Sequence, residues 1–119
     1  DTTKYTRCYR ELSAKSIIIN ESLKYIDSNR KALSKAYPTF EKFRKKYDIP
    51  ASLVDNVLSK GEKQNVKPKD DAELAKTREN IQRIMKALVA RDLWDMNEYF
   101  CLIYEDDEVV RKAVELLSE

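Results

Sequence analysis

The stretch DAELAKTRENIQRIMKALVARDLW, residues 71–94, carries the strongest helical signal of the chain. Its apolar residues recur with helical spacing and form one stripe: Leu74, Ile81, Ile84, Met85 and Leu88. Charged and amide side chains occupy the positions between them, as on the outer side of an amphipathic helix. Asp70 or Asp71 can accept hydrogen bonds from the free amides at its start. The stretch therefore predicts a long helix with one face in the core of an α-helical protein.

The same periodicity extends over residues 5–37, where apolar residues recur at alternating steps of four and three, with polar interruptions at Ser16 and Arg30. Because a helix longer than about 25 residues is unusual in a globular protein, we expect a break near residues 27–29, Asp-Ser-Asn. The β-branched run over residues 17–19 lies within this periodicity and without turn signals. It therefore predicts a buried part of a helix and not a strand.

Shorter elements surround these two regions. A proline ends the first region, and Thr39 can cap a short helix over residues 40–47. Another helix follows the next proline, and Gly61 weakens or stops it. Residues 61–70 form the clearest linker of the chain.

Beyond residue 94 the apolar pattern continues at slightly shifted phase through Leu93, Met96, Phe100 and Ile103. A last helix is expected from Asp106 or Asp107 to about residue 117. Together these patterns predict an all-α fold of five or six helices without a sheet, in a single domain over residues 1–119.

Composition limits the chemistry that the chain can perform. Its 119 residues have the length of one domain, with 42% hydrophobic and 37% charged residues, a single glycine and no histidine. One glycine excludes glycine-rich phosphate loops and nucleophile elbows, which need several. The absence of histidine removes the commonest general base and the commonest metal ligand. We therefore expect no enzyme activity from this chain alone, no cofactor and no metal.

The charge balance does not indicate a nucleic-acid partner. The net charge is +2 and the pI is near 8.5, which is lower than the pI above about 9 that is typical of a nucleic-acid-binding module. The densest basic stretch, residues 42–47, interleaves cations with aromatic residues, but Glu41 and Asp48 flank it, which favours the solvated face of an amphipathic helix. No apolar run reaches the roughly 20 residues of a membrane span.

Two cysteines, Cys8 and Cys101, lie far apart in the sequence. A structural zinc site needs about four cysteine or histidine ligands, so these two do not form one. Two interpretations remain open. The favoured one is a pair of buried, small apolar side chains, and the other is a disulfide between the first and last thirds of the chain.

Two further motifs have simple explanations. Residues 28–31 match the Ser-x-x-Lys pattern of some acyl-transferring enzymes, but the companion motifs are missing. The four acidic residues at 105–108 lack the alternation and the glycine of a calcium loop. Acidic residues at a helix start bind free backbone amides and complement the helix dipole. No catalytic residue is therefore assigned.

The end of the quoted stretch carries the candidate interface: Arg91, Asp92, Trp94 and Asp95. Arg91 and Asp92 interrupt an otherwise apolar run, which indicates either a local salt bridge or contacts to another domain. Trp and Arg are enriched at interface hot spots, and on a continuous helix Arg91 and Trp94 project to the same side. For a single Trp in an apolar helix, packing in the domain's own core is the commoner case.

The same region resembles a known protein family. The residues that carry the resemblance are 86–94, 97–100, 105–107 and Val110, together with 37–43 and the helix after Pro50. They resemble the extreme C-terminal region of carboxyl-terminal processing (tail-specific) serine peptidases of the Bacteroidetes type. The complete proteins of that family join a PDZ-like peptide-binding domain to a protease domain with a Ser–Lys dyad, usually exported to the cell envelope. No residue of this chain matches the motifs around that dyad.

The resemblance implies a non-catalytic helical accessory domain that packs on a protease core and helps substrate access or assembly. Its partners would be the upstream protease and PDZ-like domains of the same parent chain, and its location the cell envelope or periplasm. A first residue Asp1 in place of Met fits a piece excised from a longer peptidase. The alternative is an independent helical protein–protein interaction module with no peptidase link.

Overall fold

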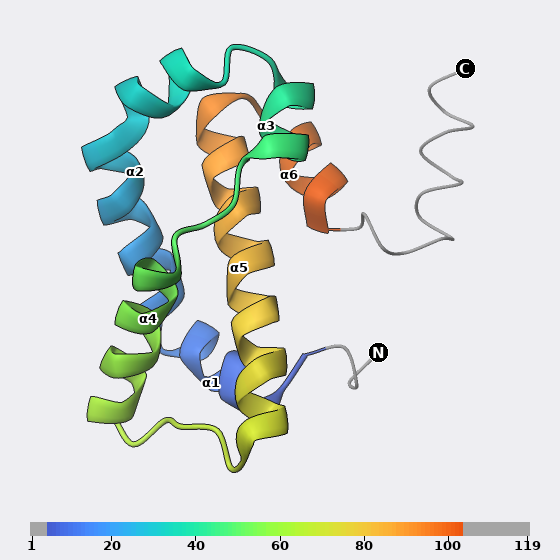
Figure 1. Ribbon diagram of the computed structural model, residues 1–119. Helices are drawn as coiled ribbons and strands as arrows, with labels where there is room; N and C mark the ends of the chain where they lie inside the picture. Colours follow the sequence, from blue (N-terminus) through green and yellow to red (C-terminus); the bar gives the residue numbers. More distant parts are fainter. Residues whose placement is uncertain (1–4, 104–119) are drawn as a thin grey trace.

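Six helices make up the part of the chain that the computed structural model describes, residues 5–103 (Figure 1). They are α1 (Arg7–Ala14), α2 (Ile17–Ala36), α3 (Phe40–Lys46), α4 (Ala51–Lys63), α5 (Asp71–Leu93) and α6 (Met96–Ile103). No strand occurs in these residues. The predicted all-α, single-domain fold is therefore confirmed. The helix predicted from Asp106 lies outside the described residues.

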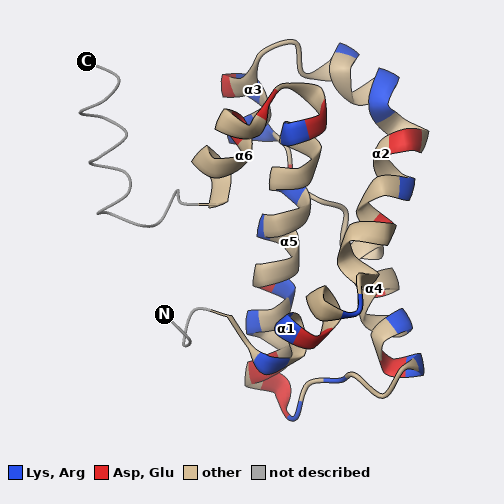
Figure 2. Ribbon diagram, turned by 180° about the vertical axis from the view of Figure 1, so that it is seen from behind, with Lys and Arg blue, Asp and Glu red and all other residues tan. Residues whose placement is uncertain are grey.

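Helix α5 is the centre of the molecule. It contacts α1, α2, α4 and α6, and in Figure 1 α2 and α4 lie on one side of it and α6 on the other. Ile81, Met85 and Leu88 of the predicted stripe are buried in α5, whereas Lys76, nearer the start of the helix, is exposed. Basic and acidic residues spread over the outer sides of the helices in Figure 2. The helical period thus determined which side of α5 faces the core.

The start of α5 is capped as the sequence predicts. Asp70 Oδ1 accepts a hydrogen bond from the Glu73 amide at 2.8 Å, and Glu73 Oε1 accepts one from the Lys69 amide at 3.1 Å. Thr39 caps α3 in a similar way, because its hydroxyl accepts from the Lys42 amide at 3.3 Å. Both caps satisfy amides that have no partner within the helix.

The break predicted near residues 27–29 is wrong, because α2 runs without interruption through them. Asn29 stays in the helix, where its side-chain amide donates to the Tyr25 carbonyl oxygen at 2.8 Å. The chain turns instead at Lys15 and Ser16, between α1 and α2. Ser16 has a φ of 62°, in the left-handed region that makes such a sharp corner possible. The run 17–19 is helical, as predicted, and Ile17 and Ile18 are buried.

Gly61 does not stop α4, which continues to Lys63. The glycine is buried where α4 meets α1, and a Cβ at this position would overlap the Leu12 side chain. Its carbonyl oxygen accepts from the Val66 amide at 2.8 Å, and Val66 is buried. The predicted linker over 61–70 is therefore shorter: the connection begins at Gln64 and is anchored by Val66.

The cysteines follow neither interpretation completely. Cys8 is buried in α1, Cys101 is exposed on α6, and both are free thiols. Burial is thus confirmed for Cys8 and wrong for Cys101, and the structure has no disulfide between them. None of the helices within residues 5–103 is long and apolar enough to cross a membrane.

Candidate interface at the α5–α6 corner

The four candidate residues lie at a sharp corner between α5 and α6. Helix α5 ends at Leu93, and Trp94 leaves the helical conformation with φ −127° and ψ −98°. Asp95 then starts α6: its side chain accepts from the Met96 amide at 2.7 Å and its carbonyl oxygen from the Tyr99 amide at 3.3 Å. The expectation that Arg91 and Trp94 project to one side of a continuous helix is therefore wrong.

Trp94 is half-buried and belongs to an aromatic cluster that packs against the core. Its ring meets Phe40 edge-on at a centroid distance of 5.6 Å and Phe43 at 5.3 Å. Phe43 is fully buried and also stacks on Tyr47 at 4.8 Å. Such edge-to-face and offset contacts are the preferred arrangements of aromatic rings. Trp94 thus fixes α3 against the end of α5, in agreement with the core interpretation.

Asp92 also has an internal partner. Arg30 of α2 donates to it twice, from Nε to Oδ2 at 2.6 Å and from a terminal nitrogen to Oδ1 at 3.0 Å. The same guanidinium reaches Asp27 at 3.1 Å. The hydrogen bonds and charge of Asp92 raise the pKa of Arg30. A two-pronged pair of this kind fixes orientation as well as distance, so it ties the end of α5 to α2.

Arg91 and Asp95 remain at the surface of the corner. The Arg91 guanidinium lies 5.9 Å from the centroid of the Tyr99 ring, within range of a cation–π contact. Beside them, Met96 and Phe100 of α6 are 39% and 45% exposed. We call these four residues, Arg91, Asp95, Met96 and Phe100, the corner surface. The apolar pattern of the sequence placed Met96 and Phe100 on one face and did not predict their exposure. Two residues four apart on a short helix share a face, but this spacing alone does not show whether that face is covered.

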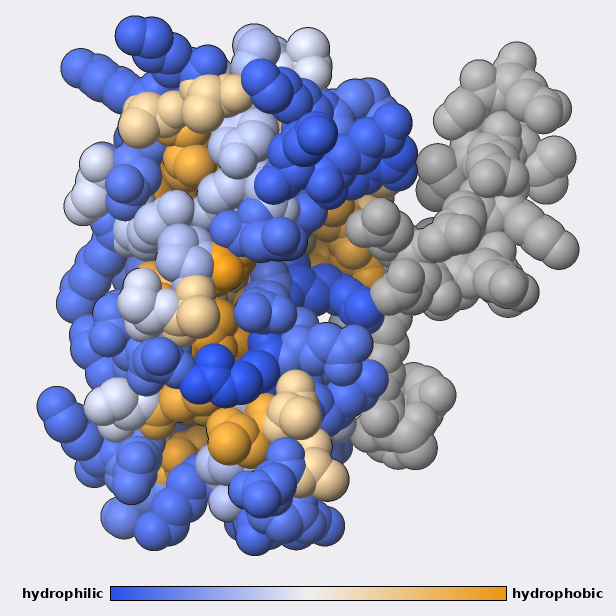
Figure 3. All heavy atoms as spheres, in the orientation of Figure 1, coloured by the Kyte–Doolittle hydropathy of each residue, from blue (hydrophilic) through white to orange (hydrophobic). Residues whose placement is uncertain are grey.

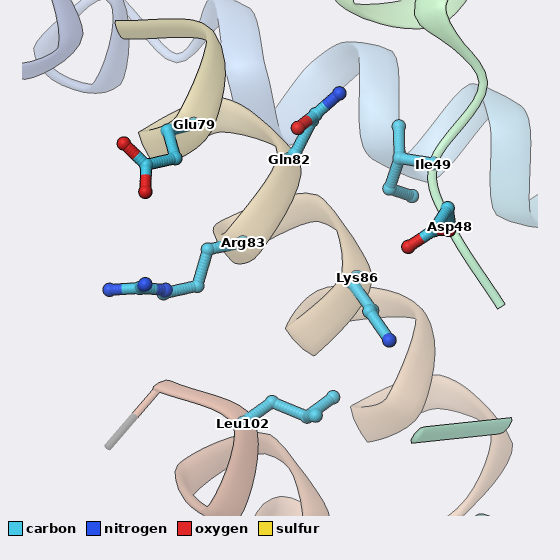
Figure 4. Close-up of a pocket in the computed structure, with 7 residues that line it drawn as sticks. All are labelled: Asp48, Ile49, Glu79, Gln82, Arg83, Lys86 and Leu102. Carbon is cyan, nitrogen blue, oxygen red and sulfur yellow. The ribbon is translucent and has the colours of Figure 1, made fainter. Parts of the chain in front are cut away.

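A polar hollow of about 490 Å³ lies between α5, α6 and the connection from α3 to α4 (Figure 4). Its lining consists of Asp48, Ile49, Glu79, Gln82, Arg83, Lys86 and Leu102. Lys86 donates to the Arg44 carbonyl oxygen at 2.7 Å and lies 5.8 Å from the centre of the Phe43 ring, so it joins α5 to α3. In Figure 4 the Arg83 and Glu79 side chains extend together to the opposite side. None of the described residues in this lining carries a hydroxyl or thiol nucleophile.

The other motifs form no catalytic arrangement in the part of the chain that the structure describes. Ser28 and Lys31 are both exposed on α2. No three His, Cys, Asp or Glu side chains come together as metal ligands among residues 5–103. The acidic run 105–108 lies outside the described residues.

Comparison with known families gives a match over most of the chain. The model of one family, DUF8443, described as a family of unknown function, matches residues 8–95. The chain belongs to the DUF8443 family. No curated protein and no solved structure matches the chain.

The DUF8443 match can be placed on the structure. It extends from α1, where it begins at Cys8, to Asp95 at the corner. It includes both members of the Arg30–Asp92 pair and the aromatic cluster around Trp94. Met96 and Phe100 lie just beyond it. Of the corner surface, Arg91 and Asp95 therefore lie within the DUF8443 match and the two apolar residues lie outside it.

Proposed function

We propose that this chain is a non-catalytic helical accessory domain of a carboxyl-terminal processing serine peptidase of the cell envelope. In this proposal the domain packs on the protease core through the corner surface and helps substrate access or assembly. The peptidase link rests on the resemblance of residues 86–94, at the end of α5 and the corner after it, and of residues 97–100, which form half of α6. The observation that carries the interface is the exposure of Met96 and Phe100, one helical turn apart.

The corner surface has the composition of a docking site. Exposed large apolar side chains that lie together and are bordered by polar groups are typical of protein interfaces. Full burial of a Met or Phe side chain is worth about 1.5–3 kcal/mol, so the exposed part of these two still offers a substantial gain. Arg91 and Asp95 add one charge of each sign at the edge, which can orient a partner. Within a single chain a modest surface suffices, because a tethered partner has a high effective concentration.

The reading frame upstream of Asp1 is the first test. A PDZ-like segment followed by a Ser–Lys peptidase domain, in frame with this chain, would support the accessory-domain proposal. An initiation codon immediately before Asp1 would contradict it and leave the alternative, an independent helical interaction module.

The corner surface can then be tested in the full-length peptidase. The double substitution Met96→Ser and Phe100→Ser should lower peptidase activity or thermal stability of the full-length protein, while the isolated chain unfolds at an unchanged urea concentration. The matched control is Lys31→Ser with Lys35→Ser, two exposed α2 residues without ion pairs among the described residues. Equal losses in both variants would contradict the role of the corner surface.

The non-catalytic part of the proposal has its own assay. The purified chain should leave unstructured peptides with apolar C-termini intact. Cleavage that survives repurification and disappears in Ser28→Ala would overturn it.

A further inference from the structure

A second surface lies on the other side of α5 from α6. In Figure 1, α2 and α4 lie on this side of α5. The end of α1, the start of α2 and the end of α4 border a hollow of about 400 Å³. Its principal lining residues are Lys15, Ile17, Glu21, Leu23, Lys24 and Lys60. We call this hollow the basic groove.

The basic groove carries an excess of positive charge. The Glu21 side chain is only 9% exposed and forms an ion pair with Lys60, and the same carboxylate oxygen lies 3.7 Å from Lys24 Nζ. One carboxylate thus faces two ammonium groups. Lys15 adds a third cation without an ion pair among the described residues, so three lysines and one glutamate leave a net charge of +2.

An exposed leucine lies among these lysines. Leu23 is 46% exposed, more than Met96 or Phe100. It borders the same hollow as Ile17, which is buried at the α1–α2 corner. On the α2–α4 side of Figure 3, hydrophobic surface lies between hydrophilic side chains. Leu23 therefore offers apolar surface, beside the lysines, that an apolar side chain of a partner can cover.

The walls of the basic groove are fixed from inside. Leu12 of α1 is fully buried against Gly61 of α4, where the missing side chain permits close contact. The corner at Ser16 sets the angle between α1 and α2 with only two residues between the helices. A preformed site of this kind spends little binding free energy on ordering its own side chains and backbone.

We propose that the basic groove binds an acidic segment of a partner protein, with an apolar side chain against Leu23 and carboxylates beside Lys15 and Lys24. The lining favours this occupant over a polyanion. Among the described residues that line it there is no arginine, whose planar fork is the side chain best suited to phosphate, and no aromatic ring on which a base could stack. Leu23 would also contribute nothing to a phosphodiester. The inference does not depend on the peptidase link.

The test uses the full chain, labelled with ¹⁵N, and a blocked peptide of sequence Ser-Glu-Glu-Leu-Asp-Glu-Ser. The peptide should shift the amide signals of the basic groove and leave those of α6 unchanged. The double variant Lys15→Gln with Lys24→Gln should raise the Kd about fivefold, because each exposed charge contact is worth a fraction of a kcal/mol. Leu23→Ser should also weaken binding. Lys60 is kept, because its loss would leave the buried Glu21 carboxylate with Lys24 alone.

The matched control is Lys31→Gln with Lys35→Gln, which removes the same amount of charge from α2 outside the groove. It should change the Kd less than twofold. If both double variants weakened binding equally, the effect would depend on net charge alone and the proposal would be overturned. The absence of shifts with the acidic peptide, or equal shifts with its Gln and Asn counterpart, would also overturn it. If heparin bound more tightly than the peptide, and in a way that depends on the groove lysines, the ligand would be a polyanion and the proposal would be overturned. If the chain dimerised with increasing concentration and Leu23→Ser abolished this, the occupant of the groove would be a second copy of the chain, which would also overturn it.

Discussion

At the residue scale, Leu88 and Lys76 mark the two faces of α5. Leu88 is 5% exposed in the core, so Leu88→Ala should leave a cavity and lower the free energy of unfolding by about 2–5 kcal/mol. Lys76 lies at the surface, 3.6 Å from Glu79. Exposed ion pairs of this kind contribute little to stability, so Lys76→Ala should change the free energy of unfolding by no more than about 0.5 kcal/mol. Urea titrations measure both, and similar losses would contradict the assignment of faces.

Arg91 and Asp92 are neighbours in sequence with different roles in the structure. Asp92→Ala removes both hydrogen bonds from Arg30 and should lower the free energy of unfolding of this chain by about 1 kcal/mol. Among the described residues, Arg91→Ala removes a cation–π contact with Tyr99 at an exposed site, and this should lower the free energy of unfolding by about 0.5 kcal/mol or less. Under the proposed function, the larger effect of Arg91→Ala is on the stability or activity of the full-length peptidase.

Melting temperatures of the two alanine variants, measured on this chain, check the first part. A loss of several kcal/mol in Arg91→Ala would show that its contacts are internal and would contradict its place in the corner surface. The sequence alone could not separate the two residues, because the partner of Asp92 lies 62 positions away. Local spacing indicates which side chains share a helix face and not which distant element they reach.

At the element scale, the pattern of apolar residues predicted helices well and their ends less well. The α5 stripe and the caps at Thr39 and Asp70 depend on local spacing, and they were found. The turn at Ser16 and the corner at Trp94 depend on contacts between helices: Leu12 with Gly61, and Trp94 with Phe43. Such packing overrides a weak local preference, as at residues 27–29, where helix-breaking composition is tolerated.

Gly61 gives the sharpest test at this scale. In an exposed helix Gly→Ala stabilises by about 1 kcal/mol. Here the new Cβ would overlap Leu12 and lie 3.2 Å from the Val66 carbonyl oxygen, so Gly61→Ala should instead lower the free energy of unfolding by about 1–3 kcal/mol.

Ser59→Ala, at an exposed position two residues earlier in α4, is the matched control and should leave stability nearly unchanged or slightly raised. Urea titrations of the two variants decide the matter. A stabilised Gly61→Ala variant would mean that α1 and α4 do not pack as closely as described.

At the scale of the whole molecule, several weakly acidic groups are buried or half-buried and are protonated at neutral pH. Burial, and a hydrogen bond with Tyr25 at 2.8 Å, raise the pKa of Tyr47 far above its usual value near 10. Burial also raises the pKa of Cys8 and of Tyr9. Cys8 and Tyr9 lie in α1, and Tyr47 follows α3 and bonds to Tyr25 of α2, so their titration affects α1, the aromatic cluster and α2 together.

The sign of the resulting pH dependence follows from linkage. A group whose pKa is higher in the folded than in the unfolded state contributes its full stabilisation below the unfolded pKa, and this is lost as pH rises toward the folded pKa. The unfolded chain then releases protons that the folded chain still holds. The free energy of unfolding should therefore be constant near neutral pH and fall from about pH 9 upward, first through the thiol and then through the phenols.

Tyr47→Phe separates the phenol from the lysines that also lose charge at alkaline pH, among them Lys60 in its ion pair with Glu21. At neutral pH the free energy of unfolding of this variant should be about 1 kcal/mol lower than that of the wild type, because the partly buried Tyr25 hydroxyl loses its hydrogen-bond partner. Between pH 9 and 11 its stability should fall less steeply than that of the wild type, since the unfolded variant has one proton fewer to release. Urea titrations across that range give both slopes. Parallel slopes would show that Tyr47 ionises as readily in the folded molecule as in the unfolded chain, and the buried aromatic cluster that joins α3 to the α5–α6 corner would then be open to water.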